Sequence, residues 1–346
     1  MTERAAFIGN VQVLRGVAAL MVVAVHSIDV TLLLPRSTLA VPAQLENFGS
    51  AGVDLFFVIS GFIIASTAFG SVPRKPLDFA RQRFWRVVPL YFLLSLPYLL
   101  TSPDMDLGML VATVLFWPAT YPYSLSAPLM LIGWTLCFEM LFYAAAALVL
   151  VRPGRGMVAA VLLAYGVCWV LAEVTNLSAF RFLGNPLCVE FLMGVLIARL
   201  APRLPGRMGS VAVALGVTWF AVMIVLGLEG RGFPDPEVWT RLLVWGMPAA
   251  LIVLGAVVMK PWTAPGMAPL LGVGAASYSI YLAHPLALWL LDATLRGLGP
   301  QLGGYGVLAL CLGASVGVGI LVHRCIEQPL LEFGRTARLR PAPAAP

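Results

Sequence analysis

The stretch LRGVAALMVVAVH, residues 14–26, places an arginine and a histidine at the two ends of the first apolar run of the chain. In a helix of about 3.6 residues per turn, Arg15 and His26 project from the same face. Their separation along the axis is roughly 16 Å, about half the thickness of a bilayer core. Ionisable side chains at such depths are costly in lipid and are usually functional. The pair therefore marks a candidate site inside a membrane.

The composition predicts an all-α polytopic membrane protein. Of the 346 residues, 60% are hydrophobic and 11% are charged, whereas soluble domains carry about 25% charged residues. The net charge of +6 does not indicate nucleic-acid binding, because the basic residues lie in short loops between apolar runs. About ten of these runs are long enough to be transmembrane helices: 11–31, 50–69, 87–101, 133–151, 157–174, 186–201, 210–228, 242–259, 270–291 and 304–323.

The run 107–117 is short for a span, and we interpret it as an outer-side re-entrant or interfacial segment. With this assignment all but five of the 22 Lys and Arg residues fall on the cytoplasmic side, as the positive-inside rule requires. Both termini are then cytoplasmic. The exceptions, on the outer side, are Arg36, Arg181, Arg231, Arg241 and Arg296. Residues 1–332 are expected to form one transmembrane domain, and residues 333–346 a basic, Pro- and Ala-rich, disordered tail.

A cluster of basic residues lies in RQRFWRVVP, residues 81–89, at the inner end of the third predicted span. Its arginines, Arg81, Arg83 and Arg86, are explained either as a positive-inside anchor or as a polyphosphate site at the inner face. Coenzyme A and nucleotide-sugars are the candidate ligands of such a site. The residues alone leave both explanations open.

Three carboxylates lie inside apolar runs, where they need partners or a wet cavity. They are Asp54, Glu139 and Glu190. The segment SYSIYLAHP, residues 277–285, adds Tyr281 and His284, which share a helix face. Because the chain has three histidines and no clustered ligand spacing, we expect no metal site.

The predicted topology sorts these groups by depth. We expect Arg15 and the arginine cluster at the inner face. The other groups fall from the midplane outward: His26, His284, Asp54 and Glu139. One end of the protein then suits an anionic cytosolic donor, and the other suits a neutral acceptor rich in hydroxyl groups.

In combination, these segments resemble the acyltransferase-3 family of integral membrane acyltransferases, and within it the bacterial exopolysaccharide O-acetyltransferases. The resemblance implies transfer of an acyl group, usually acetyl from acetyl-CoA, to a sugar hydroxyl at the bacterial inner membrane. The segments occur in family order from residue 11 to about residue 330: VQVLRGVAALMVVAVHS, GVDLFFVISGFII, RFWRVVPLYF, GWTLCFEMLFY, NPLCVEFLMGVLIA, SYSIYLAHPL and IEQPL.

The resemblance also assigns motifs to residues. The Arg-x10-His motif of the family falls on Arg15 and His26, its Arg-x-x-Arg motif falls on Arg83 and Arg86, and its glutamate falls on Glu139. We therefore expect the arginine cluster to hold the phosphates of acetyl-CoA, and Arg15 to orient the thioester or the pantetheine arm.

His26 is then expected to act as general base on the acceptor hydroxyl, or to carry the acyl group covalently. Glu139 or Asp54 would fix the tautomer of its imidazole. Further residues are expected to contact the acceptor: Tyr281, His284 and Trp134. The expected partners are a polysaccharide or lipid-linked oligosaccharide, membrane lipids and other polysaccharide-assembly proteins, but not nucleic acid.

Two other functions fit parts of the pattern. A transporter or flippase of a lipid-linked sugar or small metabolite also carries charges inside a helical bundle, but typically shows inverted repeats, which are not evident here. A glycosyltransferase that uses polyprenyl-phosphate sugars would need acidic residues on an outer loop. Asp104 and Asp106 are the tight acidic pair that this alternative would use.

Overall fold

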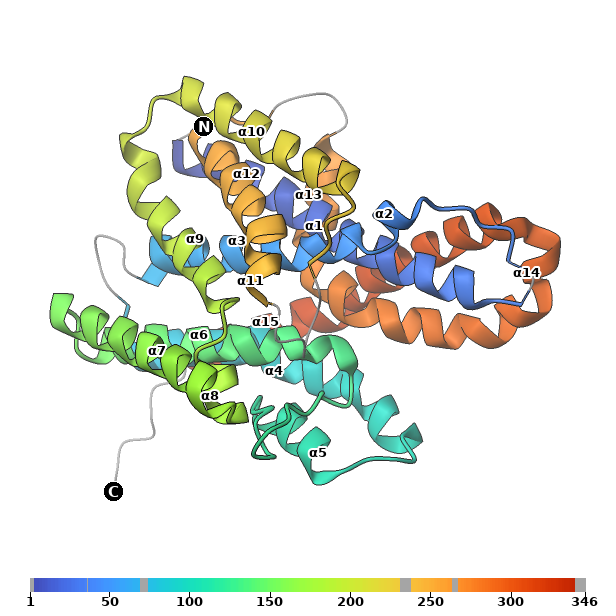
Figure 1. Cartoon of the computed structure of the whole chain (residues 1–346), viewed down its shortest axis with the longest axis horizontal. Helices are drawn as coiled ribbons and strands as arrows, with labels where there is room; N and C mark the ends of the chain where they lie inside the picture. The colour runs from blue at the N-terminus through green and yellow to red at the C-terminus, as the bar shows by residue number, and fades with distance from the viewer. Residues whose placement is uncertain (1–2, 36, 69–73, 231–237, 263–266, 340–346) are drawn as a thin grey trace.

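The computed structural model describes residues 3–35, 37–68, 74–230, 238–262 and 267–339, and these form helices and connections without a strand (Figure 1). The α-helices are α1 (Glu3–Leu33), α2 (Ala43–Glu46), α3 (Ala51–Ala68), α4 (Pro76–Thr101), α5 (Leu107–Val114), α6 (Trp134–Val151), α7 (Arg155–Thr175), α8 (Ser178–Leu183), α9 (Cys188–Leu200), α10 (Gly206–Val225), α11 (Val238–Arg241), α12 (Met247–Val258), α13 (Met267–Ala275), α14 (Ser277–Val322) and α15 (Gln328–Leu339).

In these described ranges, nine helical segments are long and apolar enough to cross a membrane. They correspond to nine of the ten predicted runs, which confirms the all-α polytopic class. The remaining run, 270–291, is divided at Ala276 between α13 and α14. The protein is therefore a multi-pass membrane protein whose ninth predicted span is a broken helix.

The short run 107–117 forms α5, whose eight residues extend only about 12 Å. It is too short to span a bilayer core of about 30 Å, as the sequence predicts. Asp106 is the N-cap of α5, and its carboxylate accepts a hydrogen bond of 2.7 Å from the backbone N–H of Met109. One member of the acidic pair considered for a glycosyltransferase thus has a local structural role.

Helix α1 lies at the centre and contacts α3, α12, α13 and α14. Close approach is possible because Gly52 on α3 and Gly274 on α13 face backbone carbonyls of α1, which an added Cβ would overlap. Small residues at helix contacts are usual in membrane proteins. Figure 1 shows α9, α10 and α12 on one side of α1 and α3, and α4, α6, α7 and α8 on the other. Helix α1 thus runs through the interior of the bundle.

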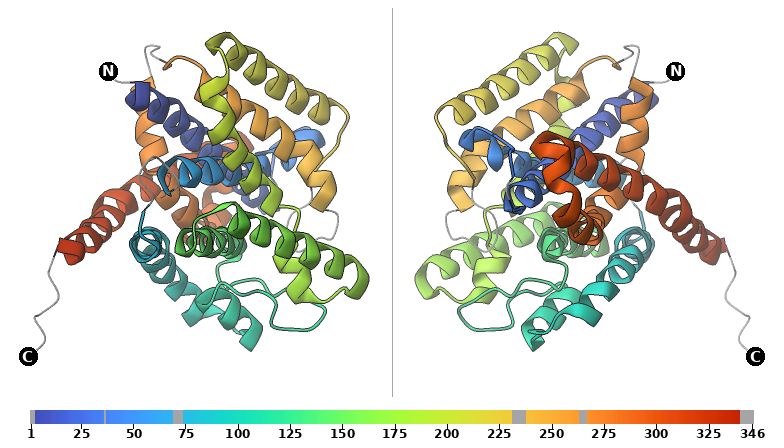
Figure 2. Two further views of the ribbon diagram at one scale, coloured as in Figure 1. Left: turned by 90° about the vertical axis from the view of Figure 1, so that its left-hand side faces the viewer. Right: turned by 90° about the vertical axis from the view of Figure 1, so that its right-hand side faces the viewer.

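Helix α14 is a helical hairpin with antiparallel arms (Figure 1). The chain turns at Gly303, whose φ of 69° lies in the left-handed region that glycine adopts without steric cost. A π-helical segment, His323–Glu327, then leads from α14 into α15. Figure 2 shows this last helix extending beyond the bundle.

Residues 333–339 belong to α15, so the disorder expected from residue 333 onward is not found for them. The physical reason is a packing contact that sequence spacing does not reveal. The ring centroids of Phe333 and Trp85 on α4 are 5.3 Å apart, which anchors α15 against the bundle. The rest of the predicted tail, residues 340–346, lies outside the described residues.

Candidate active site

A cavity of about 540 Å³ lies between α1, α3, α4, α6, α14 and the C-terminal segment. This volume lies within the range of small-molecule sites, about 300–1,000 Å³. The lining residues on α3 extend from Val53 to Ile64, so the cavity follows that helix for about 16 Å. Near Val53 its walls are apolar or carry hydroxyls, whereas its charged walls are contributed mainly by α1, α4, α6 and α15. The cavity therefore suits an elongated ligand with an anionic end.

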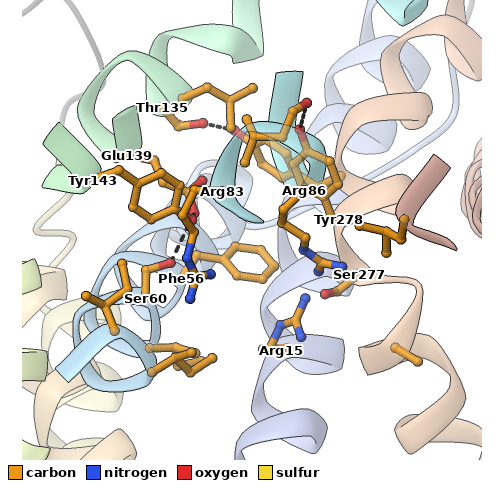
Figure 3. A pocket seen from close by; sticks show the side chains of 18 of the residues that line it. Arg15, Phe56, Ser60, Arg83, Arg86, Thr135, Glu139, Tyr143, Ser277 and Tyr278 are labelled. Atoms are coloured by element: carbon orange, nitrogen blue, oxygen red, sulfur yellow. Dashed lines mark hydrogen bonds between the residues drawn. The ribbon is translucent and has the colours of Figure 1, made fainter. Parts of the chain in front are cut away.

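Three of the predicted site arginines line this cavity: Arg15 on α1, and Arg83 and Arg86 on α4. Arg83 and Arg86 are three residues apart and so share one face of α4. Figure 3 shows Arg15 and Arg86 directed toward each other, with Arg83 across the cavity beside Tyr143. The structure thus brings together two motifs that are about seventy residues apart in the sequence.

Arg83 is held by aromatic rings rather than by a carboxylate. Its guanidinium carbon lies 5.5 Å from the ring centroid of Phe79 and 5.3 Å from that of Tyr143, within the range of cation–π contacts. Its Nε is buried and has no hydrogen-bond partner among the described residues. A guanidinium with unused donors at a cavity wall is suited to bind a phosphate.

Arg86 is fixed by a buried carboxylate, Glu327 of the π-helical segment. Glu327 accepts hydrogen bonds from Arg86 Nη1 at 2.7 Å, from Ser279 Oγ at 2.6 Å and from His323 Nδ1 at 2.6 Å. This network joins α4, the first arm of α14 and the C-terminal segment at one point. The position of Arg86 in the cavity therefore depends on the C-terminal segment.

Arg81 does not line the cavity, and its side chain is exposed. It precedes Arg83 by a helical rotation of about 200° and Arg86 by about 140°, so it lies on another face of α4. Our expectation that the three arginines of the cluster would act on the same phosphates is therefore not met. The structure brings two of them together.

Glu139 lines the cavity with Arg15, at the donor end predicted for the arginines. Its carboxylate accepts a hydrogen bond from Ser60 Oγ at 3.3 Å and another from the Tyr143 hydroxyl. It does not contact His26, so it does not fix the imidazole tautomer in this arrangement. Helices α6 and α3 pack with Glu139 beside Ser60, on the part of α3 nearer the Arg15 end.

Asp54 is also separate from His26. Its two carboxylate oxygens accept hydrogen bonds of 3.0 and 2.7 Å from Arg241, and both side chains are buried. The Arg241 guanidinium also stacks on Trp134 and Trp245, with its central carbon 5.7 and 4.9 Å from their ring centroids. Asp54 and Trp134 thus both contact Arg241 and do not line the cavity, and the predicted contact of Trp134 with the acceptor stays a prediction.

His26 contacts His284, with ring centroids 5.0 Å apart. His284 Nδ1 lies 2.6 Å from the carbonyl oxygen of Tyr281, so it carries the proton and donates it to that acceptor. That carbonyl is available because the residue four positions later, Pro285, has no backbone N–H. His284 Nε2 is then an acceptor, and His26 Nδ1, 3.2 Å away, donates to it.

This arrangement leaves the lone pair of His26 on Nε2. The Nδ1 proton of His26 is shared between His284 Nε2 and the carbonyl oxygen of Val22, which is 2.9 Å away. Nε2 has no hydrogen-bond partner within the part of the chain that the structure describes. A histidine with one nitrogen fixed by a neighbour and the other unengaged has the geometry of a general base or nucleophile.

Tyr281 lies between the cavity and the two histidines. Its side chain lines the cavity, and its ring centroid is 6.0 Å from that of His284. Its hydroxyl contacts Thr135 Oγ1 at 2.9 Å and the carbonyl oxygen of Ile132 at 3.2 Å. Neither histidine lines the cavity, so in this conformation the layer formed by Tyr281 and Thr135 separates the two regions.

Several residues of this region were not predicted. Glu327 lies in the quoted segment IEQPL but received no role, and Arg335 was counted as part of a disordered tail. Arg241 was counted only as an outer-side charge. An acidic residue that follows an apolar run and stands two positions before Pro329 is a usable signal for Glu327. The Arg241–Asp54 pair joins residues that are far apart in the sequence and gives no local signal.

Comparison with known proteins identifies the family. Residues 8–324 match the acyltransferase-3 model, described as an acyltransferase domain. The chain belongs to the acyltransferase-3 family. This acyltransferase is 33% identical over 314 residues to the exopolysaccharide production protein ExoZ of Rhizobium meliloti (strain 1021), covering 85% of this chain and 93% of that protein. It is 27% identical over 310 residues to the putative membrane-bound transacylase BcsY of Komagataeibacter xylinus, covering 80% and 76%. No solved structure matches it.

Proposed function

We propose that this membrane acyltransferase moves an acetyl group from acetyl-CoA to a hydroxyl of an exopolysaccharide or its lipid-linked precursor, at the bacterial inner membrane. One observation carries the proposal: a single helix, α1, presents Arg15 to a cationic cavity and His26 to an orienting histidine. The relative ExoZ is named for exopolysaccharide production, which supports the acceptor class.

The cavity fits the donor. Its lining combines Arg15, Arg83 and Arg86 with an apolar part that reaches Val53. Acetyl-CoA has the matching asymmetry, with phosphates at one end and a narrow thioester arm at the other. Arg83, with its unused donors, binds a phosphate, and Arg15 and Arg86 add positive charge. The charged end then faces the cytoplasm, where acetyl-CoA is available.

The chemical step uses the free nitrogen of His26. Nε2 takes the proton of the acceptor hydroxyl while the hydroxyl oxygen attacks the carbonyl carbon of the thioester. The C–O bond forms, the C–S bond breaks and coenzyme A leaves as a thiolate, which takes up a proton and restores neutral His26. In the covalent variant, Nε2 attacks the thioester first, the C–S bond breaks and coenzyme A leaves as a thiolate. The acceptor hydroxyl then takes the acetyl group from Nε2, the C–N bond breaks and the proton of the hydroxyl passes to the thiolate. In both routes His284 holds the imidazole in the productive tautomer.

The family assignment favours this enzyme over the transporter or flippase alternative. The Tyr281–Thr135 layer adds a requirement, because the acetyl group must pass it to reach His26. Reorientation of the Tyr281 side chain away from Thr135 opens that route. Keeping the layer closed between turnovers protects the thioester from water.

The test uses the full chain reconstituted in nanodiscs, radiolabelled acetyl-CoA and deacetylated exopolysaccharide oligomers. We expect the wild-type protein to label the oligomer and His26→Ala to lose at least 100-fold in rate with unchanged acetyl-CoA affinity, since general-base groups contribute about 10²–10⁴-fold. Arg83→Ala should instead weaken acetyl-CoA binding about tenfold. At a saturating concentration of acetyl-CoA, this variant should transfer the acetyl group at the wild-type rate. Retained transfer in His26→Ala would falsify the assignment of His26.

A further inference from the structure

The C-terminal helix α15 contributes one whole face to the cavity. The lining residues on it are Gln328, Leu331, Glu332 and Arg335, and their spacing of three, four and seven residues defines a single helical face. We propose that this face recognises the nucleotide half of coenzyme A, with Arg335 binding its phosphate and Glu332 its ribose or adenine. This inference rests on the proposed function and specifies which part of the donor the C-terminal helix binds.

Two anchors hold α15 where it can do this. At its start, Glu327 receives hydrogen bonds from Arg86 and from His323 in the same buried network. In its middle, Gly334 packs so closely on Trp85 that an added Cβ would overlap the indole ring. Both anchors connect α15 to α4, the helix that carries Arg83 and Arg86. The two helices therefore pack together and both line one site.

The charges of the site leave Arg335 available to a phosphate. The charge of Arg86 is balanced by Glu327 at 2.7 Å. Arg335 forms no ion pair with any described residue, although its side chain lines the cavity. It is exposed, so it keeps its donors available to a ligand that arrives from solvent. Arg335 is thus a cation of the cavity that an incoming phosphate can bind without displacing a carboxylate.

Glu332 gives the face its selectivity. A carboxylate one turn from Arg335 accepts hydrogen bonds from hydroxyl or amino groups. The face spans about 10 Å from Gln328 to Arg335, which matches a nucleoside with a phosphate at one end better than an isolated phosphate ion. A ribonucleoside phosphate therefore fits the chemistry of this face.

Arg335 is tested by comparing donors with and without the nucleotide. The full chain in nanodiscs is titrated with acetyl-CoA, with acetyl-3′-dephospho-CoA and with S-acetylpantetheine. We expect Arg335→Ala to weaken acetyl-CoA binding about tenfold, Arg335→Lys to weaken it less, and both to leave S-acetylpantetheine affinity unchanged. Arg324→Ala, which removes an exposed arginine outside the cavity lining, is the matched charge control and should bind all three donors normally.

The outcomes separate this inference from the proposed function. If Arg335→Ala binds acetyl-CoA as the wild type does, or weakens both kinds of donor equally, α15 does not recognise the nucleotide, while the acetyl-CoA assignment still stands. If the wild-type protein binds none of the donors, the proposed function fails and this inference fails with it. A loss for acetyl-CoA that persists with the dephospho donor assigns Arg335 to the diphosphate, and a loss confined to acetyl-CoA assigns it to the 3′-phosphate.

Discussion

The two ends of α1 carry side chains on the same helix face, but their surroundings are opposite. Arg15 faces a cavity shared with charged groups from α4, α6 and α15. His26 faces a histidine and a backbone carbonyl, and no carboxylate hydrogen-bonds to it among the described residues. The first environment gathers charge to bind an anion, and the second fixes the direction of one nitrogen lone pair. In the proposed function, donor binding and chemistry are thus placed at separate positions along one helix.

In this arrangement carboxylates lie at the Arg15 end of α1 and do not contact the histidine pair. The largest expected effect comes from testing whether Asp54, which pairs with Arg241, has any role in catalysis. We expect Asp54→Ala to lower the free energy of unfolding by about 3 kcal/mol, because the buried Arg241 loses the carboxylate that accepts two of its hydrogen bonds. Asp54→Leu combined with Arg241→Met should recover most of this loss, since apolar replacement of a buried pair is often neutral. Unfolding of the detergent-solubilised protein, followed with temperature, measures both effects.

The control is Asp292→Ala, which removes an exposed ion pair with Arg296 and should leave the free energy of unfolding nearly unchanged. Acetyl transfer by the double variant decides the role of Asp54. Activity near that of the wild type means that the carboxylate has a structural role. A stable double variant without activity would mean that Asp54 takes part in catalysis, and the histidine end would then depend on a carboxylate.

The sequence predicts the spans well because burial in lipid requires long apolar runs, which are local in the chain. It predicts the Arg15–His26 geometry for the same reason, since both residues lie on one helix. It misplaces Asp54 and Glu139 because their partners, Arg241 and Ser60, lie on other helices. Partner choice between helices is set by packing, which a single sequence does not encode locally.

Helical phase explains which arginines of the cluster reach the cavity. The rotation between Arg81 and Arg83 is available from residue numbers alone, and it separates Arg81 from the other two. The proton on His284 Nδ1 could also be inferred, because Pro285 leaves a carbonyl of the preceding turn free. The position of α15 could not be inferred from the sequence, because it depends on the contact of Gly334 with Trp85 on another helix.

A pair of isosteric substitutions at His284 tests the histidine end directly. The Oε1 of a glutamine reaches the position of His284 Nε2 and can accept the proton of His26 Nδ1, whereas an asparagine stops at the depth of Nδ1. We expect His284→Asn to lower kcat about 100-fold, equivalent to about 2.7 kcal/mol, and His284→Gln to retain most of the activity. The KM for acetyl-CoA should not change in either variant.

Steady-state kinetics with oligomer acceptor and varied acetyl-CoA separates kcat from KM for these variants. A positioning role for His284 predicts the difference between glutamine and asparagine. Equal losses in both variants would mean that His284 acts through its imidazole itself, for example by contacting the acceptor. A rise in the KM for acetyl-CoA would mean that the histidine end and the donor cavity are not separate sites.

The smallest expected effect lies at the boundary between the two environments. Tyr281→Phe removes the hydroxyl that contacts Thr135 and the carbonyl of Ile132, but it keeps the ring that lines the cavity. We expect a loss of about 1 kcal/mol in the free energy of unfolding, because a buried hydrogen bond contributes about that much. Thermal unfolding and kcat are measured on the same preparation, with kcat expected within about threefold of wild type. If the hydroxyl instead took part in the chemistry, kcat would fall about 100-fold with the fold intact. Such a fall would mean that the Tyr281 hydroxyl takes part in catalysis together with His26.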